Sequence, residues 1–288
     1  MQISVIIPAY NEEAGLGRTL EALAASPDSG PDIEIVVAAN GCTDGTASVA
    51  RSFGVRVLDL PTPSKTAALN AADVIATSYP RIYLDADIVV SPALIRALAN
   101  AVTTPGTLAA VPGRAVDVSG STWPVRSYYA INSRLPVFVG RLFGRGVIAL
   151  SKEACERFDQ FPDIIADDMF LDSVVDSHER TEIDAVVRVV APRTFGDLVR
   201  RVARARAGND EFWRWYREVG SSLGMAAHSV PAARPGSWLT DVVIRSPRLW
   251  PASLCYVAVG LFADAKRRRR GWTVRSGWGR PEAGPGHG

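Results

Sequence analysis

Short apolar runs alternate with helix-forming stretches through the first third of the chain. The runs at 2–8, 32–39, 55–60 and 81–84 are rich in β-branched residues, as buried strands are. Leu16, Leu20 and Leu23 recur at helical spacing after the first run, and segments 47–53 and 65–77 are typical of helices. This alternation predicts an α/β fold with a parallel, doubly wound sheet. Ligands of such sheets bind beyond the carboxyl ends of the strands, so the residues after each strand are the candidates for a site.

The pattern is less regular after residue 104. We expect strands at 142–150 and 185–191, and helices over 152–158, 165–175 and 196–207. The Gly- and Pro-rich segment 271–288 is expected to be a flexible tail.

Composition excludes several classes of protein. Lys and Arg number 32 against 30 Asp and Glu, so a net charge of +2 argues against nucleic acid as a partner. Three scattered Cys and three His offer neither a zinc site nor a disulfide framework. The N-terminus lacks the basic start of a secretion signal, and no apolar run reaches the length of a spanning helix, so we expect a cytoplasmic protein.

Paired carboxylates follow the fourth run. Asp85 and Asp87 stand at i and i+2, and on an extended segment their side chains would point the same way. Two like charges so close are costly without a cation, and oxygen ligands suit magnesium or manganese. The alternative is an ordinary polar strand end.

Two further charged groups occur later in the chain. Asp167 and Asp168 lie where a helix is expected to begin, so one of them could cap that helix and the other act as a general base. Arg200, Arg201, Arg204 and Arg206 follow, with no Asp or Glu between 198 and 208. Unpaired guanidinium groups on one helix suit a pyrophosphate, although a solvated face is the simpler interpretation.

Two phosphate-binding motifs are ruled out. Gly15-Leu16-Gly17 begins like a dinucleotide fingerprint but lacks its third glycine and falls inside a helix. The chain contains no GxxxxGK[ST] loop.

Taken together, six ordered motifs across residues 2–210 resemble the family 2 glycosyltransferases, which are inverting enzymes. They are SVIIPAYNEE, NGCTDGT, KTAALNAA, LDADIVV, ADDMFL and RRVARARAGN. The resemblance implies the GT-A fold, with a mixed, mostly parallel sheet flanked by helices. It divides the chain into a glycosyltransferase domain at 1–230, with a nucleotide-sugar half at 1–103 and an acceptor half at 104–230, and a C-terminal helical segment at 231–270.

The resemblance also implies roles for individual residues. Asp168 would be the catalytic base, and Asp85 and Asp87 would hold a divalent metal, Mn or Mg. Arg201, Arg204 and Asp167 would contact the diphosphate or the acceptor. The nucleotide would be bound by Pro8, Ala9, Tyr10, Glu12, Asn40, Lys65, Asp85 and Ala86. The expected partners are a nucleoside-diphosphate sugar donor and a carbohydrate, lipid-linked or small-molecule acceptor.

The chain departs from the family pattern at three places. Ala39-Asn40 replaces a usual Asp-Asp pair, Asp167 replaces a usual Glu, and QxxRW is missing, which argues against a processive synthase. The remaining alternatives are a nucleotidyltransferase, which would need a Gly-rich phosphate loop after the first strand, and a degenerate member that binds a nucleotide without transfer.

The segment 249–270 combines an apolar run with five consecutive basic residues at 266–270. One interpretation is a helix at an anionic membrane surface, which would place the protein peripherally at the inner face of the plasma membrane. The other is an amphipathic helix docked on the domain.

Overall fold

The computed structural model describes residues 2–24, 32–222, 225 and 236–269. The expected tail at 271–288 lies outside the described residues. The elements, in chain order, are β1 (Ile3–Ala9), α1 (Glu13–Ala24), β2 (Ile33–Asn40), α2 (Thr46–Ser52), β3 (Arg56–Leu60), α3 (Lys65–Ile75), β4 (Arg81–Leu84), α4 (Pro92–Ala101), β5 (Ala109–Asp117), α5 (Trp123–Asn132), β6 (Val147–Leu150), α6 (Lys152–Cys155), α7 (Asp167–Val174), β7 (Arg180–Val190), α8 (Phe195–Trp215) and α9 (Trp250–Arg269).

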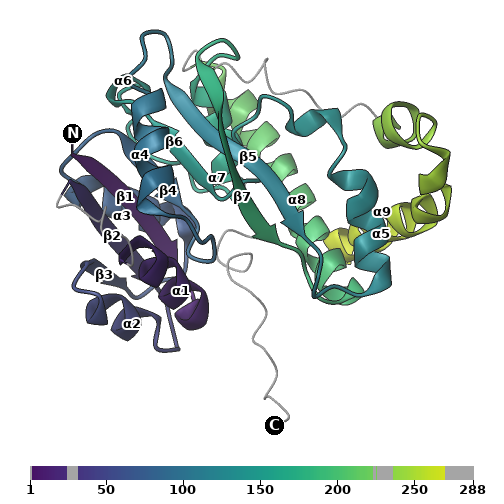
Figure 1. The fold of residues 1–288 in the computed structure, drawn as a ribbon, viewed down its shortest axis with the longest axis horizontal. Helices are drawn as coiled ribbons and strands as arrows, with labels where there is room; N and C mark the ends of the chain where they lie inside the picture. The colour runs from purple at the N-terminus through teal and green to yellow at the C-terminus, as the bar shows by residue number, and fades with distance from the viewer. Residues whose placement is uncertain (1, 25–31, 223–224, 226–235, 270–288) are drawn as a thin grey trace.

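One sheet runs through the described part of the chain in the order β3-β2-β1-β4-β6-β5-β7 (Figure 1). The pairs β2–β3, β1–β2 and β1–β4 are parallel, as the strand–helix alternation predicted. β6 runs antiparallel to both β4 and β5, and β5 and β7 are again parallel. The sheet is therefore mixed and mostly parallel, which confirms the expected fold class.

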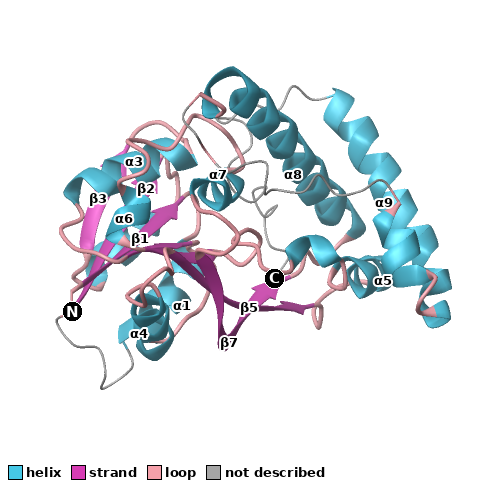
Figure 2. Ribbon diagram, turned by 90° about the horizontal axis from the view of Figure 1, so that it is seen from above, coloured by secondary structure: helices cyan, strands magenta, loops and turns pink. Residues whose placement is uncertain are grey.

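Helices cover both faces of this sheet, as Figure 2 shows with α1 and α4 on the side opposite α3 and α7. Leu16, Leu20 and Ile95 of α1 and α4 are buried against the strands on one face. Leu69 of α3 and Phe170 of α7 belong to the core of the other face. The apolar residues that recur at helical spacing thus pack into two separate cores, one on each face of the sheet. The loops at the strand ends lie outside these cores.

The second half of the chain differs from its expected elements in several places. The strand expected at 142–150 begins only at Val147, because Gly144 and Gly146 adopt positive φ angles of 77° and 70°. β5 and α5 were not expected, and α8 extends to Trp215, well beyond residue 207. α9 packs along α5 and α8 at the end of the molecule away from β3 (Figure 1).

Candidate active site

The carboxylates after β4 lie in a tight turn. The Ile88 amide donates a hydrogen bond to the Asp85 carbonyl over 3.1 Å, so the segment is not extended, and the expected geometry of the pair was wrong. The Asp85 amide donates to the Gly146 carbonyl over 2.8 Å, which ties the turn to the loop before β6. A Cβ at Gly146 would come within 2.5 Å of Ile88 Cγ1 and 3.1 Å of Asp85 Oδ2, so this close approach requires glycine.

Asp87 lies beside the start of α1. A Cβ added at Gly15 would lie 3.5 Å from Asp87 Cβ and 2.7 Å from Glu12 Oε2. Glu12 and Asp87 therefore flank the same glycine. The buried Ala86 between the two aspartates accepts a hydrogen bond from Thr19 Oγ1 through its carbonyl, which anchors the turn on α1.

Lys65 joins this turn to the start of α7. Its Nζ lies 2.7 Å from Asp85 Oδ1 and 2.9 Å from Asp167 Oδ2, and its side chain is 19% exposed. Burial alone would lower the pKa of this ammonium, but the two carboxylates raise it above its usual range. Lys65 therefore stays charged, at the first position of α3, where the Ser64 hydroxyl caps the helix.

Asp168 has backbone partners on two segments. Its Oδ2 accepts a hydrogen bond from the Gly144 amide over 3.0 Å, and its Oδ1 accepts one from the Met169 amide over 2.9 Å. Burial and the neighbouring Asp167 charge raise the pKa of Asp168 above the usual range of a carboxyl, although Lys65 and the Gly144 amide oppose the shift. A carboxylate with a raised pKa is suited to accept a proton near neutral pH.

Arg204 is the arginine of α8 that faces these carboxylates. Its electrostatic neighbours are Asp167, Asp85 and Asp168, and its Nε is buried with no hydrogen-bond partner in the described part of the chain. Burial lowers the pKa of this guanidinium, and the three acidic neighbours counteract the shift.

The other arginines of the cluster do not share this position. Arg200 pairs with Asp197, which lies just before the window in which we expected no acidic partner, so that expectation was wrong. Arg206 pairs with Asp264 of α9 over 2.8 Å. Arg201 is exposed and donates to the Val190 carbonyl over 3.1 Å.

The loops after β1 and β2 are joined to each other. Pro8 and Ala9 are buried at the end of β1, while Tyr10 and Glu12 are half-buried. The Glu12 amide donates to Thr46 Oγ1 over 2.9 Å, and the Thr43 amide donates to Asn11 Oδ1 over 2.8 Å. The segments PAYNEE and NGCTDGT therefore form one surface beside the carboxyl ends of the strands.

Asn40 differs from its expected role in a nucleotide pocket. It is fully buried, its Nδ2 donates to the Ser64 carbonyl over 2.6 Å, and its Oδ1 accepts from the Ser64 amide over 3.1 Å. Both amide atoms are occupied by the backbone just before Lys65. Asn40 therefore corrects our expectation: it positions the start of α3 instead of presenting an amide to a base.

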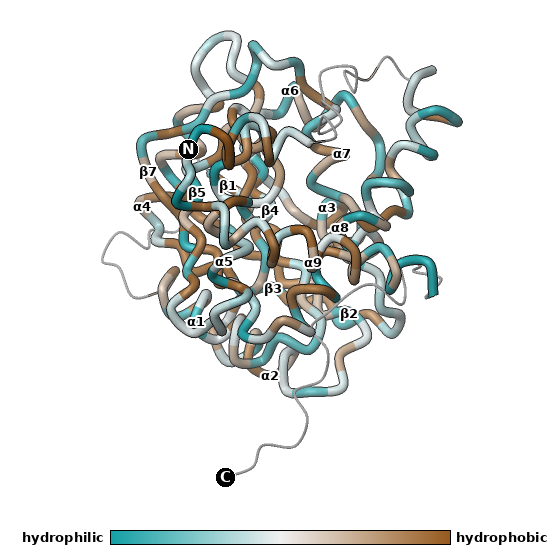
Figure 3. The backbone as a smooth tube through the Cα atoms, turned by 90° about the vertical axis from the view of Figure 1, so that its right-hand side faces the viewer, coloured by the Kyte–Doolittle hydropathy of each residue, from teal (hydrophilic) through white to brown (hydrophobic). Residues whose placement is uncertain are grey.

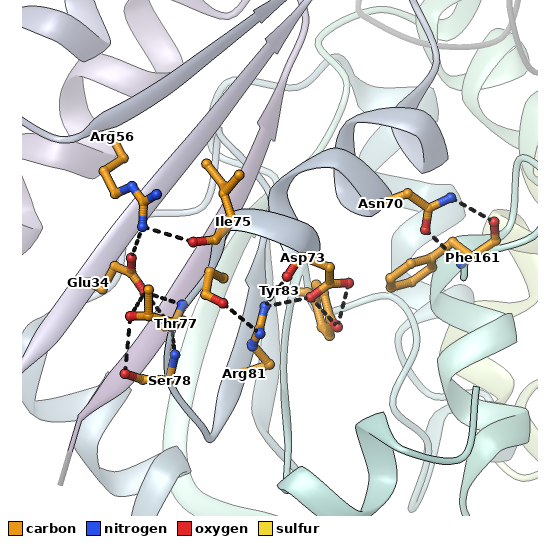
Figure 4. A network of polar contacts seen from close by, with 12 residues as sticks. Glu34, Arg56, Asn70, Asp73, Ile75, Thr77, Ser78, Arg81, Tyr83 and Phe161 are labelled. Carbon is orange, nitrogen blue, oxygen red and sulfur yellow. Dashed lines mark hydrogen bonds and ion pairs between the residues drawn. The ribbon is translucent and has the colours of Figure 1, made fainter. Parts of the chain in front are cut away.

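Sequence reasoning missed the residues that hold the loop 141–146 in place. Asp172 of α7 is fully buried, pairs with Arg141 and Arg180, and accepts a hydrogen bond from the Leu142 amide. Asn70 of α3 exchanges two hydrogen bonds with the Phe161 backbone, which fixes the segment leading to α7 (Figure 4). The close pair Gly144 and Gly146 was the available signal for a loop with special geometry.

The described residues contain no group of three or more His, Cys, Asp or Glu side chains gathered as a metal site. The nearest arrangement is the pair Asp85 and Asp87, which share one turn. Any metal there would need further ligands from a bound molecule or water.

Comparison with known proteins is consistent with this architecture. A mannosyltransferase structure from Pyrobaculum calidifontis matches with a TM-score of 0.61 and 19% identity, covering 93% of this chain and 87% of that one. A mannosyl-3-phosphoglycerate synthase from Rubrobacter xylanophilus matches with a TM-score of 0.53 and 20% identity, covering 77% and 75%. Both are glycosyltransferases of the GT-A fold, and at these identities the likeness concerns the fold.

Sequence comparison adds two findings. A validoxylamine A glucosyltransferase from Streptomyces hygroscopicus subsp. limoneus is 46% identical over 55 residues, which is 19% of this chain and only 12% of that enzyme's length. The pattern described as "Glycosyl transferase family 2" matches residues 4–149, from β1 into β6, which is more than half of the chain. The chain therefore belongs to glycosyl transferase family 2.

Proposed function

We propose that this protein is an inverting glycosyltransferase that moves a sugar from a nucleoside-diphosphate sugar to an acceptor hydroxyl. The observation that carries the proposal is Asp168, a half-buried carboxylate with a raised pKa, held by the Gly144 and Met169 amides beside Lys65 and Arg204. Asp168 takes the proton of the acceptor hydroxyl. The acceptor oxygen then attacks the anomeric carbon on the face opposite the diphosphate, whose bond to the sugar breaks, so the configuration inverts.

On the donor side, the nucleotide would lie along the surface formed by the loops after β1 and β2. The half-buried Tyr10 and Glu12 offer a ring and a carboxylate to the base and the ribose, and Asp85 lies at the end of β4 next to them in the sheet. The buried Pro8, Ala9 and Ala86 shape the floor of this surface. The Pyrobaculum mannosyltransferase was solved with GDP-Man and Mn²⁺, which supports a donor of this class.

A divalent metal, Mn or Mg, fits the donor set of the turn after β4. Asp85 and Asp87 supply carboxylate oxygens, which such hard cations prefer, and a bound diphosphate would supply the remaining oxygens. When bound, the metal would offset charge that builds up on the leaving diphosphate. Arg204 would add to this effect from α8, and Lys65 holds Asp85 and Asp167 in place. Arg201 and Asp167 are charged neighbours of Arg204, so they would contact the diphosphate or the acceptor.

The decisive experiment compares Asp168→Asn with the wild type. We expect transfer and slow donor hydrolysis to fall by about a thousandfold or more, in keeping with the loss of a general base together with its orientation. Nucleotide affinity measured by calorimetry with Mn²⁺ should stay within about twofold, because the proposal places Asp168 at the acceptor hydroxyl. Asp184→Asn is the matched control, since Asp184 is an exposed carboxylate on β7.

The companion variant Asp87→Ala should remove the dependence of nucleotide binding on Mn²⁺.

Turnover of Asp168→Asn near the wild-type rate would contradict the assignment of the base. Nucleotide binding with no transfer or hydrolysis by the wild type with any donor would favour the degenerate, binding-only alternative.

We further propose that α9 contacts a membrane surface at the cytoplasmic face. Trp250, Leu254, Val257 and Leu261 are exposed at spacings of four, three and four residues, so they form one stripe, here called the α9 stripe. Figure 3 views the molecule from the side of α9 and shows hydrophobic segments along this helix. The exposed Arg268 and Arg269 follow the stripe, and cations beside an apolar face suit anionic lipid. Among the described residues, no helix combines the length and the apolar character that crossing a membrane requires.

A further inference from the structure

Two arginines lie beside the loop that holds Asp168. Arg114 of β5 stacks over the Phe138 ring, with its guanidinium carbon 3.9 Å from the ring centroid, and its Nη1 donates to the Gly144 carbonyl over 3.4 Å. The amide of the same Gly144 binds Asp168 Oδ2. Gly144 thus connects the two side chains, with the proposed base Asp168 on its N–H and Arg114 on its carbonyl.

Arg201 comes to the same region from α8, one turn before Arg204. It is among the charged neighbours of both Arg114 and Arg204. Its guanidinium is exposed, and its Nη1 is held at the end of β7 by the Val190 carbonyl over 3.1 Å. Arg114 and Arg201 therefore line the site from two separate elements, β5 and α8, in the half of the chain after residue 104.

Neither arginine forms an ion pair within 4.0 Å in the described part of the chain, although most of their charged neighbours do. Arg145, which is buried near Arg114, is neutralised by Glu182 over 2.5 Å. Arg141 is paired with Asp172, and Arg200 with Asp197. Burial and the charges of Arg145 and Arg201 lower the pKa of Arg114, and an anion bound between these cations would offset their repulsion.

The donor carboxylates already have cations of their own. Asp85 and Asp167 already have Lys65 between them, and Arg204 faces that group. The stacking of Arg114 on Phe138 fixes the plane of its guanidinium, which presents two N–H groups in the geometry of a phosphate or carboxylate. An anion bound by Arg114 would lie on the other side of Gly144 from Asp168, the proposed base for the acceptor.

We propose that the acceptor carries a phosphate monoester near its reactive hydroxyl, and that Arg114 and Arg201 bind this phosphate. The proposal rests on the proposed transferase function and names its acceptor class. A phosphate monoester occurs both in small polyol phosphates and in lipid phosphates, and binding measurements can distinguish these two sources. Binding of the phosphate would hold the acceptor hydroxyl at Asp168 and would also neutralise the charges of Arg114 and Arg201.

The test is calorimetric titration of the wild-type protein, saturated with Mn²⁺ and the nucleoside diphosphate that binds best, with glycerol 3-phosphate and with glycerol. We expect glycerol 3-phosphate to bind at least tenfold more tightly than glycerol. Arg114→Ala and Arg201→Ala should each weaken glycerol 3-phosphate at least tenfold and leave nucleotide affinity within twofold. Arg217→Ala removes an exposed arginine after α8 and serves as the matched control.

A second arm distinguishes the two sources of phosphate. Decyl phosphate below its micellar concentration should bind more tightly than glycerol 3-phosphate if the acceptor is a lipid. Equal affinities would identify a small phosphate as the acceptor.

Three results would overturn the phosphate proposal. The first is equal binding of glycerol and glycerol 3-phosphate, and the second is no binding of either phosphate probe at millimolar concentration. The third is a loss of nucleotide affinity in the arginine variants, which would assign both side chains to the donor diphosphate. In all three the nucleotide still binds the wild type, so the proposed function stands. Failure of every nucleotide to bind the wild type would instead contradict the proposed function.

Discussion

Asp167 and Asp168 are neighbours in sequence with different surroundings. Asp167 pairs with Lys65, whereas Asp168 accepts hydrogen bonds from two backbone amides and pairs with no cation within 4.0 Å in the described residues. A carboxylate that is partly removed from water without its own cation has a raised pKa, which a base needs. The sequence predicted that the two would divide their roles. It could not show which partner each would have, because Lys65 and Gly144 come from distant segments.

Gly144 offers a test of this environment at a single residue. In Gly144→Ala, the new Cβ sits on a backbone with a φ of 77°, which costs about 1–2 kcal/mol. The same Cβ would lie 3.1 Å from Arg114 Nη1, which is a close contact. The displaced amide should weaken its bond to Asp168 and raise the pKa of that carboxyl further. We expect kcat to fall and the acidic limb of the rate profile to move to higher pH, with nucleotide affinity unchanged.

Gly140→Ala is the control for the cost of the backbone angle. Gly140 also has a positive φ, of 65°, but a Cβ there would meet nothing within 4 Å. An unchanged pH profile for Gly144→Ala would show that its amide does not tune Asp168.

At the scale of elements, periodicity was sufficient where the pattern was regular. The four expected strands and the helices between them in residues 2–84 match β1–β4 and α1–α3 to within a few residues. β5 was missed because Pro112 and Gly113 interrupt its apolar run. The structure accommodates them with a register shift against β7 at that point. Asn40 was misassigned because its position after β2 is that of a ligand residue, and only the fold shows that Ser64 occupies its amide.

Glu34 ties several elements together at the opposite ends of the strands (Figure 4). Burial would raise its pKa, but hydrogen bonds from the Thr77 amide, Ser4, Arg56 and the Thr77 hydroxyl lower it from 4.5 to about 2. A depressed carboxyl pKa stabilises the fold above pH 4.5, and this contribution is lost as the pH falls toward 2.

Glu34→Gln should therefore reduce the free energy of unfolding by up to about 3 kcal/mol at pH 7. Urea denaturation should show the difference from the wild type shrinking as the pH is lowered from 5 toward 2. Asp59→Asn, which removes an exposed carboxylate of β3, is the control. A difference that does not vary with pH would mean that Glu34 acts through packing alone.

At the scale of the whole molecule, α9 has two faces with separate expected roles. Val259 and Ala263 are fully buried against α5 and α8, while the α9 stripe is exposed. The docked-helix interpretation of 249–270 is therefore correct for one face, and membrane contact remains the proposal for the other.

Two substitutions of the same residue type separate these faces. Val259→Asp buries an unpaired charge and should destabilise the protein by about 3 kcal/mol or more, seen as a large drop in Tm. Val257→Asp lies on the exposed stripe and should leave Tm nearly unchanged. It should instead reduce flotation with vesicles of anionic phospholipid at low salt. Wild-type protein that fails to float with such vesicles would refute membrane contact.

The late position of β6 in the chain has a consequence for the order in which the sheet assembles. β4 pairs with β1 on one side and with β6 on the other, yet β6 follows it by about 60 residues, which a ribosome adds in seconds at about 5–20 residues per second. During that interval one edge of β4 is bare, and an unpaired edge invites pairing with other chains. Nascent chains stalled before residue 147 are thus the species that most need a chaperone, and the first truncation to fold alone has to extend past Leu150.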